Sequence, residues 1–102
     1  MIDVMTRLGE VKSKTAGALR IAEADRGASA VLVAVVREFD RKADKSNMHA
    51  DTETAARDAV IELEQAGDSA KAAVEADPGA SMETNQAVQD AHLAICILKT
   101  EV

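Results

Sequence analysis

A histidine and a cysteine lie four residues apart near the C-terminal end of this 102-residue chain, in the stretch AHLAICILKTEV. On a helix, His92 and Cys96 would share one face and could supply half of a metal site or a thiol activated by an imidazole. Both chemistries need further groups, and the other histidine, His49, lies in a polar stretch that no sequence pattern brings near. Free cysteine commonly packs as a small hydrophobe. We therefore expect His92 and Cys96 to contribute mainly to packing, with a reactive or metal-ligating pair as the alternative.

Acidic side chains on two other segments raise the question of a metal ion bound by carboxylates. They are Glu38, Asp40 and Asp44 in REFDRKAD, and Glu62, Glu64 and Asp68 in VIELEQAGD. All-α nucleotide pyrophosphohydrolases hold Mg²⁺ with acidic residues on two such helices, but their paired-glutamate motif is absent, since the chain has no Glu-Glu dipeptide. Because only Glu62 borders an apolar stripe, these acids are expected to face solvent.

The short motifs that usually carry catalysis are also missing. The chain has no glycine-rich phosphate loop, His-Glu-x-x-His sequence, nucleophile elbow or paired cysteine motif. The sequence therefore favours a non-enzymatic protein without catalytic, cofactor-binding or metal-ligating residues. The alternative is a small-ligand-binding protein or an enzyme, such as a metal-dependent nucleotide hydrolase, with a site inside the fold or between protomers.

Three breaks define the segments that must position these residues. Pro78 and the glycine after it end one helix in EADPGAS, and Ser81 can cap the next. The polar stretch KSNMHADTET is a second break, with Asp51 or Thr52 as the cap, and Gly27 marks a weaker third. The resulting segments are 2–25, 28–45, 52–76 and 82–99.

Each segment repeats apolar residues every three or four positions, which is typical of an amphipathic helix. The run AVLVAVV resembles a strand, but Leu32, Val36, Phe39 and Ala43 continue a helical stripe through it and beyond it. The stripe of 52–76 keeps its phase across Gly67, which indicates one helix. We predict a single all-α domain over residues 1–102, an antiparallel four-helix bundle with short loops. In the alternative, the first two segments merge into one long helix.

The last segment carries two apolar stripes instead of one. The first stripe is centred on Ile95, and the second, formed by Met82, Leu93 and Ile97, lies on nearly the opposite side. A helix in a four-helix monomer keeps one face in water, so the second stripe needs another partner. The sequence therefore predicts a helical protein–protein interaction module that forms a homodimer through its C-terminal helix, with Met82, Leu93 and Ile97 at the interface.

The net charge of −6 is unevenly distributed along the chain. Residues 1–50 contain nine basic and seven acidic side chains, whereas residues 51–102 contain three and eleven. This acidity disfavours nucleic-acid binding, which needs a basic footprint, and leaves an acidic inhibitor of a basic partner as a further alternative. The densest basic patch is explained by its place near a helix C-terminus, with docking to an acidic surface as the alternative. It consists of Arg37, Arg41, Lys42 and Lys45.

Hydropathy gives no indication of a membrane partner. The first ten residues, MIDVMTRLGE, contain no apolar signal core, and the longest apolar run, ASAVLVAVV, is too short to span a bilayer. A single cysteine excludes a disulfide framework within the chain. We therefore expect a cytoplasmic protein.

Overall fold

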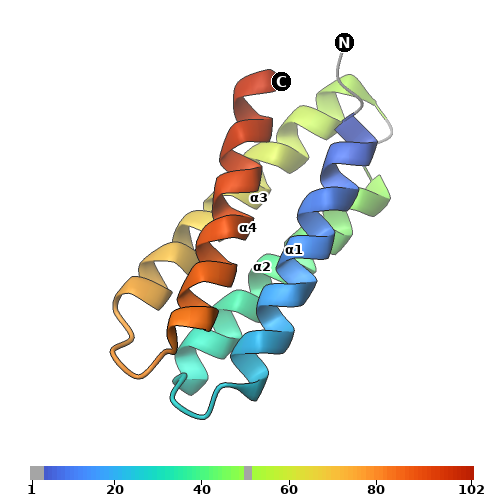
Figure 1. Ribbon diagram of the computed structural model, residues 1–102. Coiled ribbons are helices and arrows are strands. Elements are labelled where there is room, and N and C mark those ends of the chain that lie inside the picture. Colours follow the sequence, from blue (N-terminus) through green and yellow to red (C-terminus); the bar gives the residue numbers. More distant parts are fainter. Residues whose placement is uncertain (1–3, 50–51) are drawn as a thin grey trace.

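Four helices form an antiparallel bundle in a computed structural model that describes residues 4–49 and 52–102 (Figure 1). They are α1 (Val4–Ala24), α2 (Ala30–His49), α3 (Glu53–Glu75) and α4 (Met82–Glu101). Each helix packs against its two neighbours, α1 with α2 and α4, and α3 with α2 and α4. The predicted all-α four-helix bundle is confirmed. The alternative in which the first two segments merge is wrong, because a turn at residues 25–29 separates α1 from α2.

The helix boundaries follow the predicted caps, with one clear exception. Thr52 and Ser81 cap α3 and α4, where their hydroxyls accept hydrogen bonds from the backbone N–H of Ala55 and Thr84. Asp51, the other candidate cap, lies outside the described residues. The prediction that the second helix ends at residue 45 was wrong, because α2 continues to His49. Ser46 is buried in this last part, where its hydroxyl donates to the carbonyl of Lys42. The polar residues of this stretch therefore form a helical turn and not the predicted loop.

The core is formed by one face of each helix, and on α3 this face runs through Val60, Gly67 and Val74. It is built mainly from leucine, valine, isoleucine and alanine, and Phe39 is its largest side chain. The predicted continuity of α3 is confirmed, since α3 passes through Gly67 as one helix. A Cβ on Gly67 would lie only 3.2 Å from Phe39 Cζ and 3.3 Å from Ile95 Cγ2, so the glycine makes room for the aromatic ring. The core therefore depends on matched large and small residues.

The chain contains an internal repeat that the sequence analysis missed. The stretches EADRGAS and EADPGAS, which begin at Glu23 and Glu75, differ at one position and lie 52 residues apart. They form the loops of two helical hairpins, the first made of α1 and α2 and the second of α3 and α4. Ten buried positions of the first hairpin each have a buried counterpart 52 positions later. The pairs are Leu8 and Val60, Val11 and Leu63, Thr15 and Gly67, Ala18 and Ala70, Ala22 and Val74, Leu32 and Thr84, Val36 and Val88, Phe39 and Ala91, Ala43 and Ile95, and Ser46 and Leu98.

The two hairpin loops are joined by reciprocal hydrogen bonds at one end of the bundle (Figure 1). Asp25 Oδ2 accepts from the backbone N–H of Ser81 at 2.8 Å and from the hydroxyl of Thr84 at 2.6 Å. Asp77 Oδ2 accepts from the backbone N–H of Ser29 at 2.8 Å. Each carboxylate therefore lies at the N-terminus of a helix in the other hairpin, where the helix dipole favours a negative charge.

The pKa of Asp25 is lowered from 3.8 to about 2, chiefly by the backbone N–H of Ser81 and then by the Thr84 hydroxyl. Because the carboxylate is favoured in the folded state, its contribution to stability is present above about pH 4 and is lost as the pH falls through about 2. Asp25→Asn is therefore expected to lower the free energy of unfolding at pH 7 and to flatten its decline between pH 4 and pH 2. Urea unfolding at several pH values measures both effects. Asp44→Asn, at an exposed position of α2, is the control; equal pH profiles for wild type and Asp25→Asn would contradict the prediction.

Basic side chains of residues 1–50 form ion pairs with acidic side chains of residues 51–102 at two places. Arg7 on α1 forms an ion pair with Glu101 on α4, and Lys42 on α2 pairs with Glu62 on α3. Lys45 lies 3.9 Å from the same glutamate.

Within the described part of the chain, none of the helices has a stretch both long and apolar enough to cross a bilayer.

Candidate functional site

The His92–Cys96 pair gains a third member from the neighbouring helix. Asp68 on α3 faces α4, and its Oδ1 lies 2.7 Å from His92 Nε2. Cys96 Sγ lies 3.5 Å from the same nitrogen and 3.8 Å from His92 Nδ1. The three ligand atoms all lie within 4.8 Å of one another. We call these three residues the Asp–His–Cys cluster; sequence reasoning had Asp68 among the candidate acids but could not place it beside His92.

The thiol of the Asp–His–Cys cluster is poorly suited to act as a nucleophile. Burial raises the pKa of Cys96, and the carboxylates of Glu64 and Asp68 raise it further, so the thiol is protonated at neutral pH. In a Cys–His–Asp catalytic triad, the carboxylate and the nucleophile contact different ring nitrogens. Here His92 Nε2 is the nitrogen nearest both Asp68 and Cys96. This arrangement is closer to a set of convergent ligands than to a triad.

Two of the candidate acids are more buried than predicted. The side chains of Asp40 and Glu64 are only 16% and 17% exposed, so the prediction that they face solvent was wrong. Asp40 accepts hydrogen bonds from Lys12 Nζ and Thr15 Oγ1, both at 2.8 Å, and Lys99 Nζ lies 2.9 Å from Glu64 Oε1. Each acid lies at a boundary between adjacent helices and pairs with a lysine of the neighbouring helix. These acids form ion pairs within the bundle.

The basic patch on α2 is paired with acids of the same chain. Arg37 contacts Glu23 at 3.2 Å, and Arg41 contacts Glu38 through two hydrogen bonds. The remaining members, Lys42 and Lys45, contact Glu62 on α3 as described above. The acidic surface that this patch meets is therefore, at least in part, the third helix of its own chain.

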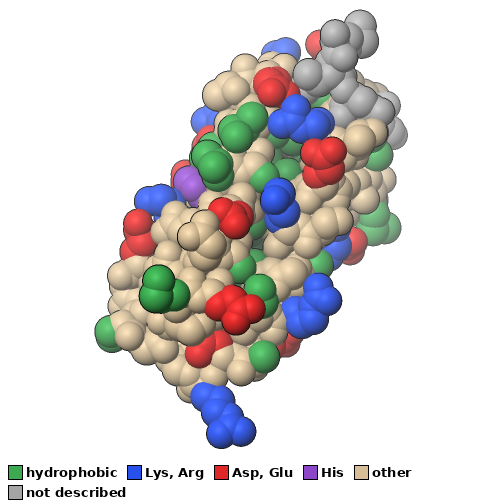
Figure 2. All heavy atoms as spheres, viewed as in Figure 1, with side chains coloured by type: hydrophobic (Ala, Val, Ile, Leu, Met, Phe, Trp, Pro, Cys, Tyr) green, Lys and Arg blue, Asp and Glu red, His purple; other side chains and the backbone are tan. Residues whose placement is uncertain are grey.

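The outward face of α4 is free of charge along most of its length. With about 100° per residue, six side chains fall within about 40° of the direction opposite the core. They are Met82, Gln86, Gln89, Leu93, Ile97 and Thr100. Met82, Leu93 and Ile97, the predicted interface residues, are 89%, 57% and 44% exposed. We call these six residues the α4 stripe; Figure 2 shows hydrophobic side chains scattered among charged ones on the face that α4 occupies.

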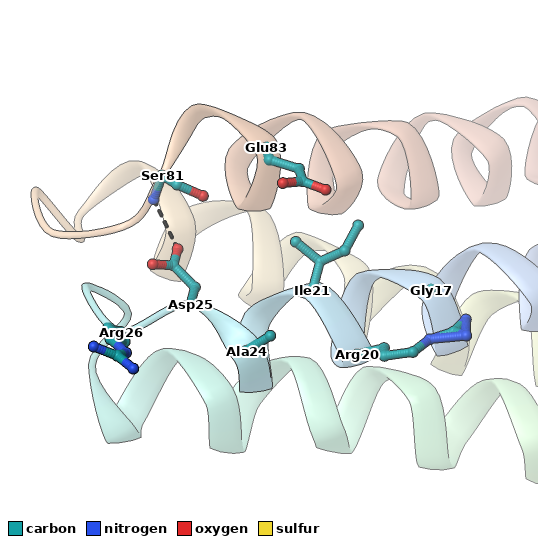
Figure 3. A pocket seen from close by; sticks show the side chains of 8 residues that line it. All are labelled: Gly17, Arg20, Ile21, Ala24, Asp25, Arg26, Ser81 and Glu83. Atoms are coloured by element: carbon teal, nitrogen blue, oxygen red, sulfur yellow. Dashed lines mark hydrogen bonds between the residues drawn. The ribbon is translucent and has the colours of Figure 1, made fainter.

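A surface pocket adjoins the hairpin loops and lacks convergent polar groups (Figure 3). It has a volume of about 520 Å³ and lies between the end of α1 and the start of α4. Arg20 and Arg26 are placed at opposite ends of the view and do not point toward a common centre. Asp25, which also lines the pocket, already accepts the backbone N–H of Ser81. The pocket therefore offers no assembled ligand site.

Comparison with protein-family models, with curated proteins and with solved structures finds no match to this chain. Two features of the described residues remain as the basis for function. They are the α4 stripe and the Asp–His–Cys cluster, which share no residue.

Proposed function

We propose that this protein is a non-enzymatic helical interaction module of the cytoplasm that forms a homodimer through the α4 stripe. The observation that carries the proposal is an uncharged outward row containing three exposed hydrophobic side chains, in a chain of which 29% of the residues are charged. The core side of α4 is already filled by Val88, Ile95 and Leu98. The stripe therefore contributes nothing to the core of the monomer and is available to a partner.

A second copy of the chain is the partner that the stripe fits best. Leu93 and Ile97 are four residues apart, so two antiparallel α4 helices related by a two-fold axis would place each leucine against the isoleucine of the other copy. A chain with a net charge of −6 repels its own copies over most of its surface. The α4 stripe lets two copies meet without opposing like charges.

The double substitution Leu93→Asp/Ile97→Asp is expected to convert the dimer to a monomer. It would place four carboxylates in the interface of two protomers, where they lose hydration and repel one another. Size-exclusion chromatography with light scattering at micromolar concentration measures the mass directly. Val31→Asp, which alters an exposed hydrophobic residue on α2, is the matched control and should leave the mass unchanged. A wild-type protein that is strictly monomeric, or a double variant that stays dimeric, would refute the proposed interface.

A further inference from the structure

We propose that the Asp–His–Cys cluster, formed by Asp68, His92 and Cys96, is a binding site for a divalent transition-metal ion of the Zn²⁺ type. The carboxylate, imidazole and thiol come from two adjacent helices and converge within 4.8 Å. This inference does not rest on self-association, because none of the three residues belongs to the α4 stripe.

The sulfur–nitrogen distance in the cluster matches that of a tetrahedral zinc site. With Zn–S and Zn–N bonds of ordinary length, tetrahedral angles hold the sulfur and nitrogen about 3.5 Å apart. Cys96 Sγ and His92 Nε2 lie 3.5 Å apart. The carboxylate oxygen of Asp68 lies 2.7 Å from the same nitrogen and would move outward by about 0.6 Å to reach a tetrahedral separation. The Asp68 side chain is 60% exposed, so its carboxylate has room to make this movement. Cys96 Sγ also lies 3.8 Å from His92 Nδ1, so the imidazole and the thiol must turn for both ligand atoms to point at one ion.

The internal repeat shows which residues His92 and Glu64 replace. In the first hairpin, the ammonium of Lys12 lies 2.8 Å from Asp40 Oδ1 and supplies a positive charge. The counterparts of these residues 52 positions later are Glu64 and His92. A carboxylate thus replaces the lysine, and Lys99 pairs with it at 2.9 Å. The ion pair of the first hairpin is thus replaced in the second by Glu64, which pairs with Lys99, and by His92, a potential metal ligand.

The types of the ligand atoms select the class of ion. Thiolate and imidazole are ligands of zinc and the neighbouring transition metals, whereas Mg²⁺ and Ca²⁺ take oxygen ligands almost exclusively. When the ion binds, the thiol of Cys96 releases its proton to water and the sulfur coordinates as the thiolate. The expected ion is therefore Zn²⁺, with Co²⁺ as a spectroscopic substitute and Mg²⁺ as a negative probe.

Titration of the purified, reduced protein with Zn²⁺ and Co²⁺ tests the site. We expect one Zn²⁺ per chain by calorimetry, no comparable binding of Mg²⁺, and a near-ultraviolet charge-transfer band with Co²⁺ that reports a cobalt–thiolate bond. Cys96→Ser and His92→Ala should each weaken Zn²⁺ binding by at least about tenfold, and Cys96→Ser should abolish the charge-transfer band. Asp68→Asn should weaken binding in the same direction.

Asp90→Asn is the matched control, because Asp90 lies on α4 and its carboxylate accepts a hydrogen bond from Gln86, away from the cluster. It should leave affinity and spectrum unchanged. The cobalt spectrum of the wild-type protein supports the site even if a variant fails to fold. Absence of zinc binding, a cobalt complex without the thiolate band, or undiminished affinity in a folded Cys96→Ser variant would each overturn the proposal.

Discussion

Replacing Gly27 with alanine is expected to lower the free energy of unfolding by about 3 kcal/mol, the upper end of the usual cost of overpacking. A Cβ at this position would lie 1.9 Å from the carbonyl oxygen of Gly79. The obstacle is backbone, which cannot swing aside as a flexible side chain can. The two loops would have to separate, and the hydrogen bonds that Asp25 and Asp77 make to the opposite loop would lengthen or break.

Gly79→Ala should have a similar effect, since its Cβ would lie 2.2 Å from the carbonyl oxygen of Gly27. Gly17→Ala is the matched control, because a Cβ on Gly17, within α1, meets nothing within 4 Å. Alanine is the better helix former, so this variant should gain about 1 kcal/mol. Urea unfolding followed by circular dichroism compares the three variants. If Gly27→Ala were as stable as the wild type, the close approach of the loops would be wrong.

Phe39→Ala is expected to destabilise the bundle by about 3–5 kcal/mol, as is usual when a buried aromatic ring is truncated. Phe39 is the one aromatic residue of the chain and is fully buried. A domain of this size has a total stability of about 5–15 kcal/mol, so the variant should lose a large share of it. Thermal and urea unfolding provide the measurement, and Phe39→Leu, which fills more of the space, should lose less.

A second substitution tests the packing partner of the ring. Gly67→Ala would place a methyl group 3.2 Å from Phe39 Cζ in the wild-type protein. In the Phe39→Ala variant the same methyl group would enter the space left by the ring and would also favour the helix. Gly67→Ala should therefore be more favourable in that variant than in the wild type, with a coupling energy of about 1 kcal/mol. Strict additivity would show that the two residues do not share a packing site.

The helical periods and caps of the sequence predicted the architecture because both are local signals. Pro78, Thr52 and Ser81 mark helix ends through backbone geometry and hydrogen bonds between residues close in the chain. The same reasoning ended α2 too early, because burial of Ser46 depends on packing with α3. It also treated EADRGAS and EADPGAS as two separate breaks, although their likeness was present in the sequence and comparing them would have found the repeat.

The sequence predicted that two of the three residues of the candidate site lie together, but not the third. His92 and Cys96 are joined by helical spacing, which a sequence shows directly. Asp68 joins them from another helix, and its contact with His92 depends on how α3 and α4 are rotated about their axes. Lys12 and Asp40 illustrate the same limit, since their ion pair also joins two helices.

The sequence by itself determined the helices, their apolar faces and the second stripe of α4, since each depends on residues within a few turns. Only the tertiary structure decided that the loops interlock at Gly27 and Gly79, and that Asp68 completes a three-residue cluster. The physical reason is that side-chain period sets which face of a helix is buried, whereas the register between helices is set by the packing of many side chains at once. A site whose residues come from two helices is therefore determined by packing, even when each of these residues can be identified in the sequence.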